Sequence, residues 1–428
     1  MKVHLKALGC RLNEAELEQW SHDFRAKGHA MVPDHEDADI VVLNTCAVTA
    51  DAGKKSRKLM NRLYRENPES KLVVSGCYAT LEADKVAEHM GVDLVVPNPQ
   101  KDKLPELVMD KFAGNVMPLV AMEPGESSLF ARGRQRAFIK IQDGCRYRCT
   151  FCIVTVARGE EKSRTLADII AEVQRLQEQG IQEIVLTGVH VGGYGSDLDT
   201  SLYELVKAIL SETDIPRIRF ASVEPWDLPD EFFALFENNR LLPHMHLPLQ
   251  SGSDTVLRRM SRRCKTDSFR HLVEQARQSV PGFNVTSDII VGFPGETEEE
   301  WRQTMEYVES VGFGHLHIFS YSAREGTKAA RLSNSVEEAV KKMRSLEMHQ
   351  LAERLKQDFA SSQLGQSVPV LWERQRIEGG KAKYSGYTPN FMKVETSVSN
   401  TVLLENRIVD TRLSAYNAEN QSLTGIVE

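Results

Sequence analysis

Short apolar runs alternate with helical patterns through the first hundred residues of the chain. Residues 3–8, 40–43 and 72–74 are apolar runs of strand length, whereas apolar positions in residues 14–27 and 52–66 recur with helical spacing. This alternation predicts repeated βα units and a parallel sheet. The carboxyl ends of parallel strands share one edge of the sheet, and open α/β sheets bind ligands at that edge.

The middle of the chain repeats the alternation of strand and helix six times. Six parallel βα units fit an incomplete (β/α)6 barrel, with its chemistry at the carboxyl ends of the strands. The strand candidates are residues 138–142, 183–187, 218–223, 245–249, 285–291 and 316–321. A long amphipathic helix follows, and its apolar residues are expected to pack into a core. These residues are Val336, Val340, Met343, Leu346, Leu351, Leu355 and Phe359.

The last part of the chain changes to short β-rich runs separated by turns. Residues 368–372, 391–396 and 402–404 predict a small all-β barrel. A stretch rich in Gly, Pro, Ser and Glu at residues 114–128 predicts a linker. We therefore expect an α/β protein with four parts. They are an N-terminal open parallel α/β domain (1–113), a linker (114–131), a partial barrel (132–364) and a small all-β domain (366–428).

Composition limits the class of protein. The chain has 428 residues, of which 41% are hydrophobic and 26% are charged, as is ordinary for a soluble globular protein. No apolar run approaches the length of a membrane helix, and the first residues lack the pattern of a signal peptide. Seven cysteines in such a chain fit a reducing compartment. We expect a cytoplasmic protein that makes no membrane contact.

Basic residues are clustered although the net charge is −7. Residues 54–65 hold six basic residues and no acidic one. Residues 132–164 hold nine basic and three acidic residues, and residues 258–270 hold six basic residues and one acidic residue. One such run fits a solvated helix face. Three runs in an acidic protein favour a polyanionic substrate over that explanation.

Three cysteines lie close together directly after the first strand candidate of the barrel. Cys145, Cys149 and Cys152, called the loop triplet below, have the spacing CxxxCxxC. Three thiolates can hold three corners of an iron–sulfur cube, and no further cysteine follows until Cys264, so one iron stays open to an outside ligand. A structural zinc site needs a fourth ligand nearby, and no histidine lies between His89 and His190.

Three more cysteines share a context although they are far apart in the sequence. Cys10, Cys46 and Cys77, called the sheet triplet below, each follow an apolar run. At the ends of parallel strands they can converge on one edge of the sheet. The alternative is that they are three small buried residues, a role that suits cysteine. The second cluster motif in the chain favours a shared site.

The loop triplet, with the aromatic Phe151 before its last cysteine, resembles that of radical S-adenosylmethionine (SAM) enzymes. The six-cysteine pattern and the order of the parts resemble, over nearly the whole chain, the methylthiotransferases of that superfamily, which end in a TRAM domain. The resemblance implies a 4Fe–4S cluster on each triplet. SAM would chelate the open iron of the loop triplet, and the cluster of the sheet triplet would supply or carry sulfur. It also implies an electron donor, such as a flavodoxin-type reductant.

Polar and glycine-rich segments after the strands are candidates for binding SAM. The glycine cluster that follows the second strand is similar to the family's motif for the methionine amine, because glycine lets a backbone approach a ligand closely. Carboxylate, amide and hydroxyl side chains after later strands can bond the ribose or the carboxylate of SAM. Without the cluster motif each would equally be a helix cap or a loop hydrogen bond. The candidates are Gly188, Gly192, Gly193, Glu224, Gln250, Ser251 and Asp288.

The family has three branches of substrate: isopentenyladenosine in tRNA, threonylcarbamoyladenosine in tRNA, and an aspartate of a small-subunit ribosomal protein. Residues 9–14, 262–264, 315–319 and 386–390 are most similar to the threonylcarbamoyladenosine branch. Residues 153–159 depart from the family, which commonly has a proline there. Cys264 is interpreted as a structural or branch-specific residue. A tRNA-binding iron–sulfur scaffold without turnover is the alternative outside the enzymes, and SAM cleavage would distinguish it.

The chemistry of the two adenosine groups differs. A threonylcarbamoyl group carries a carboxylate, which needs a cationic partner once it is desolvated, whereas an isopentenyl group needs an apolar pocket. Arginine suits a carboxylate because its planar fork binds both oxygens. The candidates are Arg146, Arg148 and Arg263.

Overall fold

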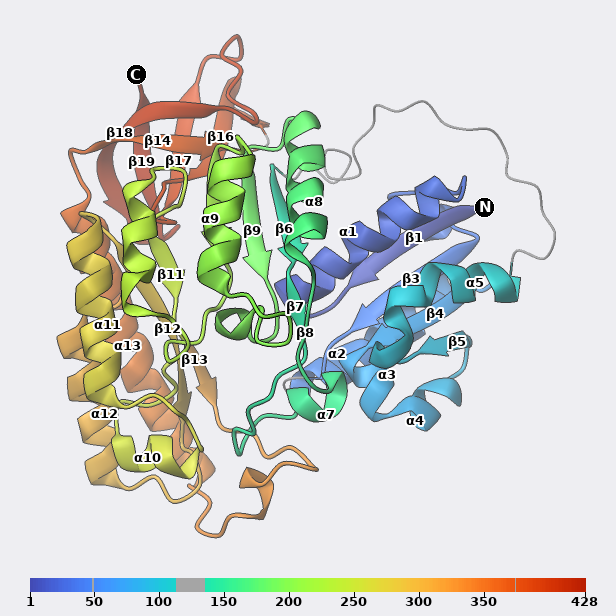
Figure 1. Ribbon diagram of the computed structural model, residues 1–428, viewed down its shortest axis with the longest axis horizontal. Coiled ribbons are helices and arrows are strands. Elements are labelled where there is room, and N and C mark those ends of the chain that lie inside the picture. The colour runs from blue at the N-terminus through green and yellow to red at the C-terminus, as the bar shows by residue number, and fades with distance from the viewer. Residues whose placement is uncertain (48–49, 113–134, 374) are drawn as a thin grey trace.

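The computed structural model describes residues 1–47, 50–112, 135–373 and 375–428, and three sheet systems follow one another along the chain (Figure 1). The linker predicted at residues 114–131 lies outside the described residues. Among the helices that the structure describes, none is both long enough and apolar enough to cross a membrane.

The N-terminal part is a parallel sheet, as predicted; it has five strands in the order β2-β1-β3-β4-β5, of which β1, β3 and β4 are the three predicted from the sequence. Side chains of the sheet alternate between two cores: α1 and α5 cover one face, and α2, α3 and α4 cover the other. The strands are β1 (Lys2–Ala7), β2 (Ala30–Met31), β3 (Ile40–Thr45), β4 (Lys71–Gly76) and β5 (Val92–Val96). The helices are α1 (Arg11–Ala26), α2 (Ala50–Glu66), α3 (Cys77–Leu81), α4 (Ala83–Ala87), α5 (Leu104–Phe112) and the 3-10 turns η1 (His35–Asp37) and η2 (Asn98–Lys103).

The middle part confirms the six-stranded partial barrel. Two three-stranded parallel sheets, β6-β9-β10 and β11-β12-β13, are joined by bridges between Ile218 and Leu241 and between Ser222 and His246. The strands are β6 (Arg136–Lys140), β9 (Glu183–Thr187), β10 (Arg217–Phe220), β11 (His244–His246), β12 (Asn284–Val291) and β13 (His315–Ser320), with a small antiparallel pair β7 (Gln142–Asp143) and β8 (Lys162–Ser163).

Helices cover the outer side of the barrel and share its large apolar core (Figure 1). They are α8 (Leu166–Glu178), α9 (Leu202–Glu212), α10 (Asp254–Arg259), α11 (Thr266–Ser279), α12 (Glu298–Val311) and α13 (Glu338–Ser362), with 3-10 turns η3 (Val191–Gly193) and η4 (Asp230–Glu237). The short helix α7 (Val154–Arg158) packs on the N-terminal part instead, and the 3-10 turn η5 (Ala329–Arg331) joins a smaller core with Val256 and Phe293.

The long helix α13 does not bury all the apolar residues expected in a core. Leu351 and Leu355 are buried in the barrel core as predicted, but Met343 is 49% exposed and Leu346 is 61% exposed. At its carboxyl end the helix packs Phe359 against the core of the C-terminal domain instead. Because the helix serves two cores in succession, its buried residues do not form a single stripe.

The C-terminal part is a mixed sheet in the order β14-β18-β19-β17-β16-β15, and an additional pairing of β14 with β16 closes it into a small barrel. The strand predicted at residues 402–404 is wrong: these residues form a loop, from which Leu404 enters the core. The strands are β14 (Ser367–Trp372), β15 (Arg376–Glu378), β16 (Lys381–Tyr387), β17 (Lys393–Val398), β18 (Ile408–Asn417) and β19 (Ser422–Val427).

Both end parts pack against the partial barrel. Helix α1 lies against β6 and β9, where Ala15 joins Phe138 and Val185 in a small core. From the other end of the chain, Phe391 in the loop between β16 and β17 places its ring 4.5 Å from the Arg219 guanidinium and 4.9 Å from the His244 ring. The barrel is therefore enclosed by elements from both ends of the chain.

Candidate active site

The loop triplet lies in the segment that connects β7 to β8. Gly144 has a φ of +72°, and a Cβ there would collide with the Glu160 carbonyl, so only glycine fits where the loop closes on itself. The amide of Cys145 donates to the Gly159 carbonyl at 3.1 Å, and the amide of Cys152 donates to the Cys149 carbonyl at 3.1 Å. These bonds fold the three thiols into one partly exposed group.

The electrostatics of the loop triplet suit an iron–sulfur cluster. Burial, the Glu224 carboxylate and the nearby thiols of Cys152 and Cys149 raise the pKa of Cys145 to about 12. Near neutral pH a thiol with such a pKa stays protonated until a cation such as an iron cluster binds it. Two donors already point at sulfur: the Val154 amide reaches Cys152 Sγ at 3.4 Å, and Arg262 Nη1 reaches Cys149 Sγ at 3.8 Å. Hydrogen bonds to the ligand sulfurs are one way in which proteins tune such clusters.

The sheet triplet follows three neighbouring strands, since β1, β3 and β4 are adjacent in the sheet. Gly9 has a φ of +110°, and a Cβ at this position would lie 2.7 Å from Cys46 Sγ, so a glycine is required for the Cys10 loop to approach Cys46. Burial raises the pKa of Cys10, and the nearby Cys77 adds to the rise. The structure therefore brings the three dispersed cysteines to one edge.

The two triplets face each other across the contact between α3, which begins at Cys77, and α7, which follows Cys152. The charge of Cys77 also contributes to the raised pKa of Cys152, which burial brings to about 11. A pocket of about 300 Å³ opens beside them, and residues that directly follow Cys46, Cys77 and Cys152 form part of its wall. Its lining is Ala47, Gly53, Arg57, Tyr78, Leu81, Glu82, Ile153, Val156, Arg324, Glu325 and Gly326.

Of the predicted SAM-binding carboxylates, Glu224 follows the end of β10 and Asp288 lies within β12. Glu224 accepts a hydrogen bond from the Gly192 amide at 3.3 Å, and burial raises its pKa. Asp288 pairs with His246 at 3.1 Å; burial opposes ionisation, but the bond from His246 outweighs it and lowers the pKa of the carboxyl. Gln250 has a φ of +86°, which is rare for a residue with a side chain.

Other predicted contacts are occupied by protein groups. The Ser251 hydroxyl lies 3.1 Å from the Thr304 hydroxyl and accepts the Ser253 amide at 3.2 Å. The ring of Phe151 packs against a core that includes Phe293 and Ile290.

The glycines after the second barrel strand are also packed against protein. A Cβ on Gly193 would collide with the His190 ring, and Cβ atoms on Gly188 and Gly192 would lie 3.0 Å from the carbonyls of Gln142 and Glu224. Close packing inside the protein explains these glycines, and contact with SAM stays a prediction for them.

A buried histidine beside the loop triplet was missed as a site residue. His190 donates to Glu161 and lies 2.6 Å from Asp227, and its ring meets the Tyr147 ring edge-on at 4.8 Å. Burial lowers the pKa of His190, but the bond to Asp227 and the other carboxylates outweigh it and raise the pKa. The only signal in the sequence was its place in the glycine-rich loop, because Glu161 and Asp227 carry no motif.

This histidine also corrects the argument against zinc. The sequence places no histidine near the cysteine loop, but the ligand atoms of Cys145, Glu161 and His190 lie within 4.8 Å of one another. Both nitrogens of His190 are nevertheless held by carboxylates, and Cys149 and Cys152 would take no part in such a site. The donor set as a whole fits a cluster of three thiolates better than a zinc ion.

The three candidate arginines differ in their partners. Arg146 pairs with Glu161 at 3.5 Å and with Asp227 at 3.2 Å, and Arg148 pairs with Glu160 at 2.6 Å. Arg263 is exposed, lies 4.6 Å from the centre of the Tyr147 ring, and has no carboxylate partner among the side chains that the structure describes.

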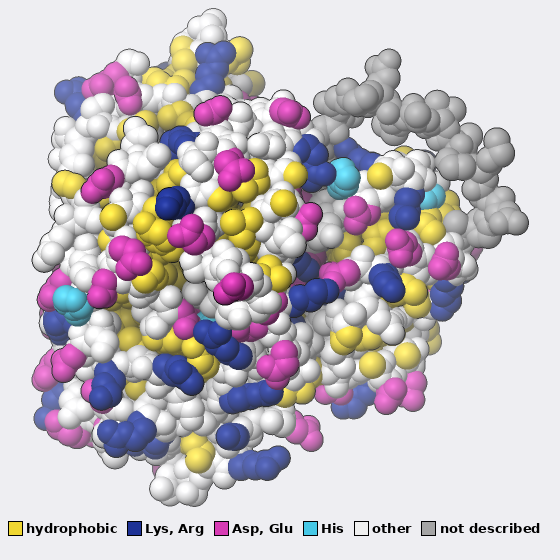
Figure 2. Space-filling view, viewed as in Figure 1, with side chains coloured by type: hydrophobic (Ala, Val, Ile, Leu, Met, Phe, Trp, Pro, Cys, Tyr) yellow, Lys and Arg dark blue, Asp and Glu magenta, His cyan; other side chains and the backbone are white. Residues whose placement is uncertain are grey.

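Basic side chains also gather on the surface. In Figure 2, Lys and Arg are frequent over the lower half of the face, between α7 and α10 of Figure 1. Helix α2 carries an exposed basic face that includes Lys54, Lys55 and Lys58, none of which forms an ion pair within the described parts of the chain.

Comparison with known proteins agrees with this architecture. Residues 139–308 match the radical SAM superfamily, and residues 2–97 match an uncharacterized protein family, UPF0004. The fold is similar to that of the radical SAM methyltransferase TsrM from Kitasatospora setae, with a TM-score of 0.58 and 16% identity over 77% of each chain.

Similar relatives span most of the chain. The threonylcarbamoyladenosine tRNA methylthiotransferase MtaB of Bacillus subtilis is 37% identical over 92% of this chain and 89% of its own, and that of Thermotoga maritima is 35% identical over 92% and 91%. The tRNA-2-methylthio-N(6)-dimethylallyladenosine synthase of Oceanobacillus iheyensis is 34% identical over 97% of this chain and 83% of its own. The chain thus belongs to the radical SAM tRNA methylthiotransferases, transferases that use SAM and two 4Fe–4S clusters.

Proposed function

We propose that this enzyme transfers a methylthio group to C2 of the adenine in N6-threonylcarbamoyladenosine, next to the anticodon of a tRNA. The observation that carries the methylthiotransfer is the arrangement of the two cysteine triplets, which face each other beside one pocket. The threonylcarbamoyl substrate is supported by the segments similar to that branch and by the names of the relatives from B. subtilis and T. maritima. The functional units of this proposal are residues 1–113, 132–364 and 366–428.

The proposed division of work follows the site. The loop triplet would hold the cluster that binds SAM and supplies a radical able to remove hydrogen from the substrate, and the sheet triplet would hold the cluster that supplies sulfur. Glu224, which follows β10, and Asp288, which lies within β12, are half-buried carboxylates and are proposed to accept hydrogen bonds from SAM. Gln250 and the glycine loop of Gly188 are proposed to shape the same site.

The substrate side needs a cation for the threonylcarbamoyl carboxylate. Of the three candidates, Arg263 is favoured because Arg146 and Arg148 already hold carboxylates. An arginine without such a partner binds a new carboxylate without first breaking an ion pair. The exposed lysines of α2 are proposed to contact tRNA phosphates, and a flavodoxin-type protein is proposed as the electron donor.

The test offers the reconstituted enzyme three substrates in separate reactions with SAM and a reductant: tRNA with threonylcarbamoyladenosine, tRNA with isopentenyladenosine, and the small-subunit ribosomal protein. Mass spectrometry of the products should show a methylthio group on the first substrate alone. Modification of the isopentenyl substrate alone would overturn the threonylcarbamoyl assignment but keep the family. An Arg263→Gln variant should raise KM for the threonylcarbamoyl tRNA, and it should cleave SAM normally in the absence of tRNA.

A further inference from the structure

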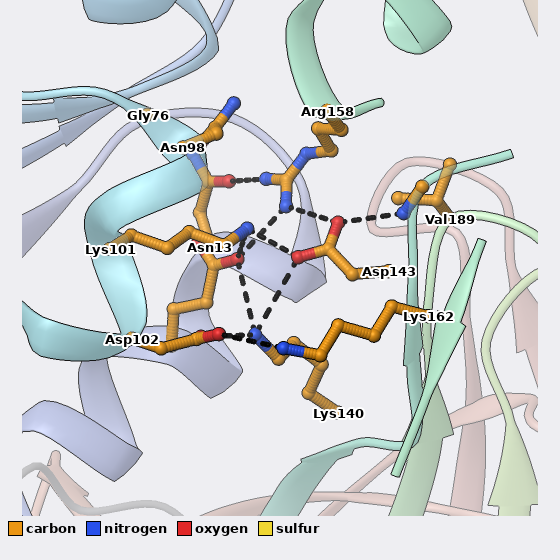
Figure 3. A network of polar contacts seen from close by, with 12 residues as sticks. Asn13, Gly76, Asn98, Lys101, Asp102, Lys140, Asp143, Arg158, Lys162 and Val189 are labelled. Carbon is orange, nitrogen blue, oxygen red and sulfur yellow. Dashed lines mark hydrogen bonds and ion pairs between the residues drawn. The ribbon is translucent and has the colours of Figure 1, made fainter. Parts of the chain in front are cut away.

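A group of buried charges lies at the seam between the N-terminal part and the barrel (Figure 3). Lys101 of η2 pairs with Glu16 of α1 at 2.5 Å and with Asp143 of β7 at 2.5 Å. Lys140 of β6 lies 4.0 Å from Glu16 and 3.6 Å from Asp143. Because buried charges are costly unless they are paired, this network fixes how the two parts meet.

Arg158 is the member of the network that reaches furthest across the seam. Its side chain is 3% exposed, and it contacts three acceptors, two on α1 and one on β7. Nη1 donates to Glu16 at 2.9 Å and to Asp143 at 3.0 Å, and Nη2 donates to Asn13 Oδ1 at 2.9 Å. A planar guanidinium reaches these acceptors from two nitrogens held in a fixed plane, whereas a lysine offers its three donors from a single nitrogen.

Asn13 connects Arg158 to the sheet triplet. Its Oδ1 accepts the Cys10 thiol at 3.6 Å, and its Nδ2 donates to the Leu8 carbonyl at 2.7 Å and to the Thr45 carbonyl at 3.2 Å. Leu8 and Thr45 lie just before Cys10 and Cys46. The asparagine therefore holds two of the cysteine-bearing strand ends together.

On its other side Arg158 is connected to the loop triplet. It ends α7, the helix that follows Cys152, and its partner Asp143 accepts the amide of Gly144, the residue before Cys145, at 2.9 Å. A second bridge runs beside it: Asn98 Nδ2 donates to the Ala157 carbonyl at 2.7 Å and lies 3.7 Å from Cys77 Sγ.

The network places more positive than negative charge in the buried part of the seam. Three cations, Lys101, Lys140 and Arg158, face two carboxylates: Glu16, which is buried, and Asp143, which is 16% exposed. The third carboxylate nearby, Asp102, is 56% exposed. The charge of Arg158 also acts on Cys10 and Cys77. A nearby cation stabilises thiolates and the more negative, reduced state of a cluster that they bind.

We propose that Arg158 is a positioning residue that fixes the separation of the two cysteine triplets and supplies the positive charge that sets the reduction potential of the cluster on the sheet triplet. This inference rests on the two clusters of the family, and it is independent of which tRNA nucleoside is the substrate.

The test compares reconstituted full-length Arg158→Met and Arg158→Lys with the wild type and with Lys162→Met. Lys162 is 79% exposed and pairs with Asp102 at the rim of the same network, so its loss removes a charge without breaking the bridge. Iron content shows whether both clusters are present. The spin–spin splitting in the electron paramagnetic resonance spectrum of fully reduced protein reports their separation, and a redox titration reports each potential.

Arg158→Met should weaken the spin–spin splitting. At the midpoint potential of the wild-type sheet-triplet cluster, the ratio of reduced to oxidised cluster should be about tenfold lower in this variant. Arg158→Lys, which keeps the charge but loses the planar fork that reaches α1 and β7 from two nitrogens, should change the splitting and keep most of the potential. Lys162→Met should change neither quantity. Lys101 and Lys140 still neutralise Glu16 and Asp143 in the methionine variant, so it is expected to fold.

Unchanged splitting and potential in both Arg158 variants would overturn the proposal. Arg158→Met is not interpretable if it loses half of its iron while Lys162→Met keeps it. In that case the splitting and the potential of Arg158→Lys decide whether the proposal holds. No tRNA is present in these measurements, so their failure would leave the proposed substrate untouched.

Discussion

The loop triplet and the sheet triplet hold the same number of cysteines but are built differently. The loop triplet lies within one connection, from β7 to β8, and is folded by short-range bonds such as that between the Cys152 amide and the Cys149 carbonyl. The sheet triplet exists only because β1, β3 and β4 are neighbours in the sheet. The first site depends on local conformation, and the second depends on the stability of a whole domain.

The largest expected difference between the two sites concerns SAM cleavage. Replacing Cys145, Cys149 and Cys152 with alanine should abolish SAM cleavage, whereas replacing Cys10, Cys46 and Cys77 should leave it in place and abolish methylthiolation. Each triple variant should lose half of about eight irons. Iron analysis and chromatography of 5′-deoxyadenosine measure both effects. A sheet-triplet variant with full iron content would contradict the assignment of a second cluster.

The next prediction uses the stability of the N-terminal domain. Met60 of α2 is fully buried in the core of that domain, so Met60→Ala should decrease its stability by about 2–5 kcal/mol. In urea, the sheet triplet should then release its iron at a lower concentration than in the wild type, and the loop triplet should not. Met343→Ala, at an exposed position of α13, is the control. Simultaneous loss of both clusters would mean that the sites do not unfold independently.

Acid should weaken the seam between the two sites. Burial favours the neutral form of Glu16, but Arg158, Lys101 and Lys140 outweigh it and lower its pKa from 4.5 to about 2. The folded state therefore gains stability from this carboxylate above pH 4.5, on the order of 3 kcal/mol, and loses it as the pH falls towards 2.

The measurement is urea unfolding of iron-free protein at a series of pH values, because acid destroys the clusters themselves. Glu16→Gln should lower stability at neutral pH and flatten the loss between pH 4.5 and 2. An identical pH profile in both proteins would contradict the ionised network.

The smallest effect concerns RNA. Basic residues near the loop triplet are mostly paired with carboxylates, whereas Lys54, Lys55 and Lys58 on α2, which follows Cys46, are not. Replacing Lys54, Lys55, Arg57 and Lys58 with glutamine should weaken tRNA binding and reduce its salt dependence by about 0.9 in the logarithmic slope for each phosphate that the protein no longer neutralises. Filter binding at several salt concentrations measures this slope. The control is the double variant Arg302→Gln and Arg354→Gln, at exposed positions of α12 and α13. An unchanged slope in the α2 variant would mean that these lysines only form a solvated helix face and do not bind tRNA.

The sequence by itself determined the parallel character of the N-terminal sheet, the six barrel strands and the two triplets. Strand-length apolar runs between helical patterns identified the parallel sheet and the six barrel strands, because these patterns depend on a few neighbouring residues. The cysteine spacing identified the loop triplet for the same reason. Local pattern misled where long-range packing decides: residues 402–404 are apolar but form a loop, and Met343 and Leu346 lie on α13 but remain exposed.

Only the tertiary structure decided which polar groups meet. Lys101 and Glu16 are 85 residues apart, and Arg158 and Glu16 are 142 apart, yet each pair is buried and in contact. His190, Glu161 and Asp227 likewise gather beside Cys145 from separate segments. Such contacts leave no periodic trace in the sequence, since a single buried charge needs one partner from anywhere in the chain. The cysteines could therefore be found before the fold was known, and the residues that hold the two sites together could not.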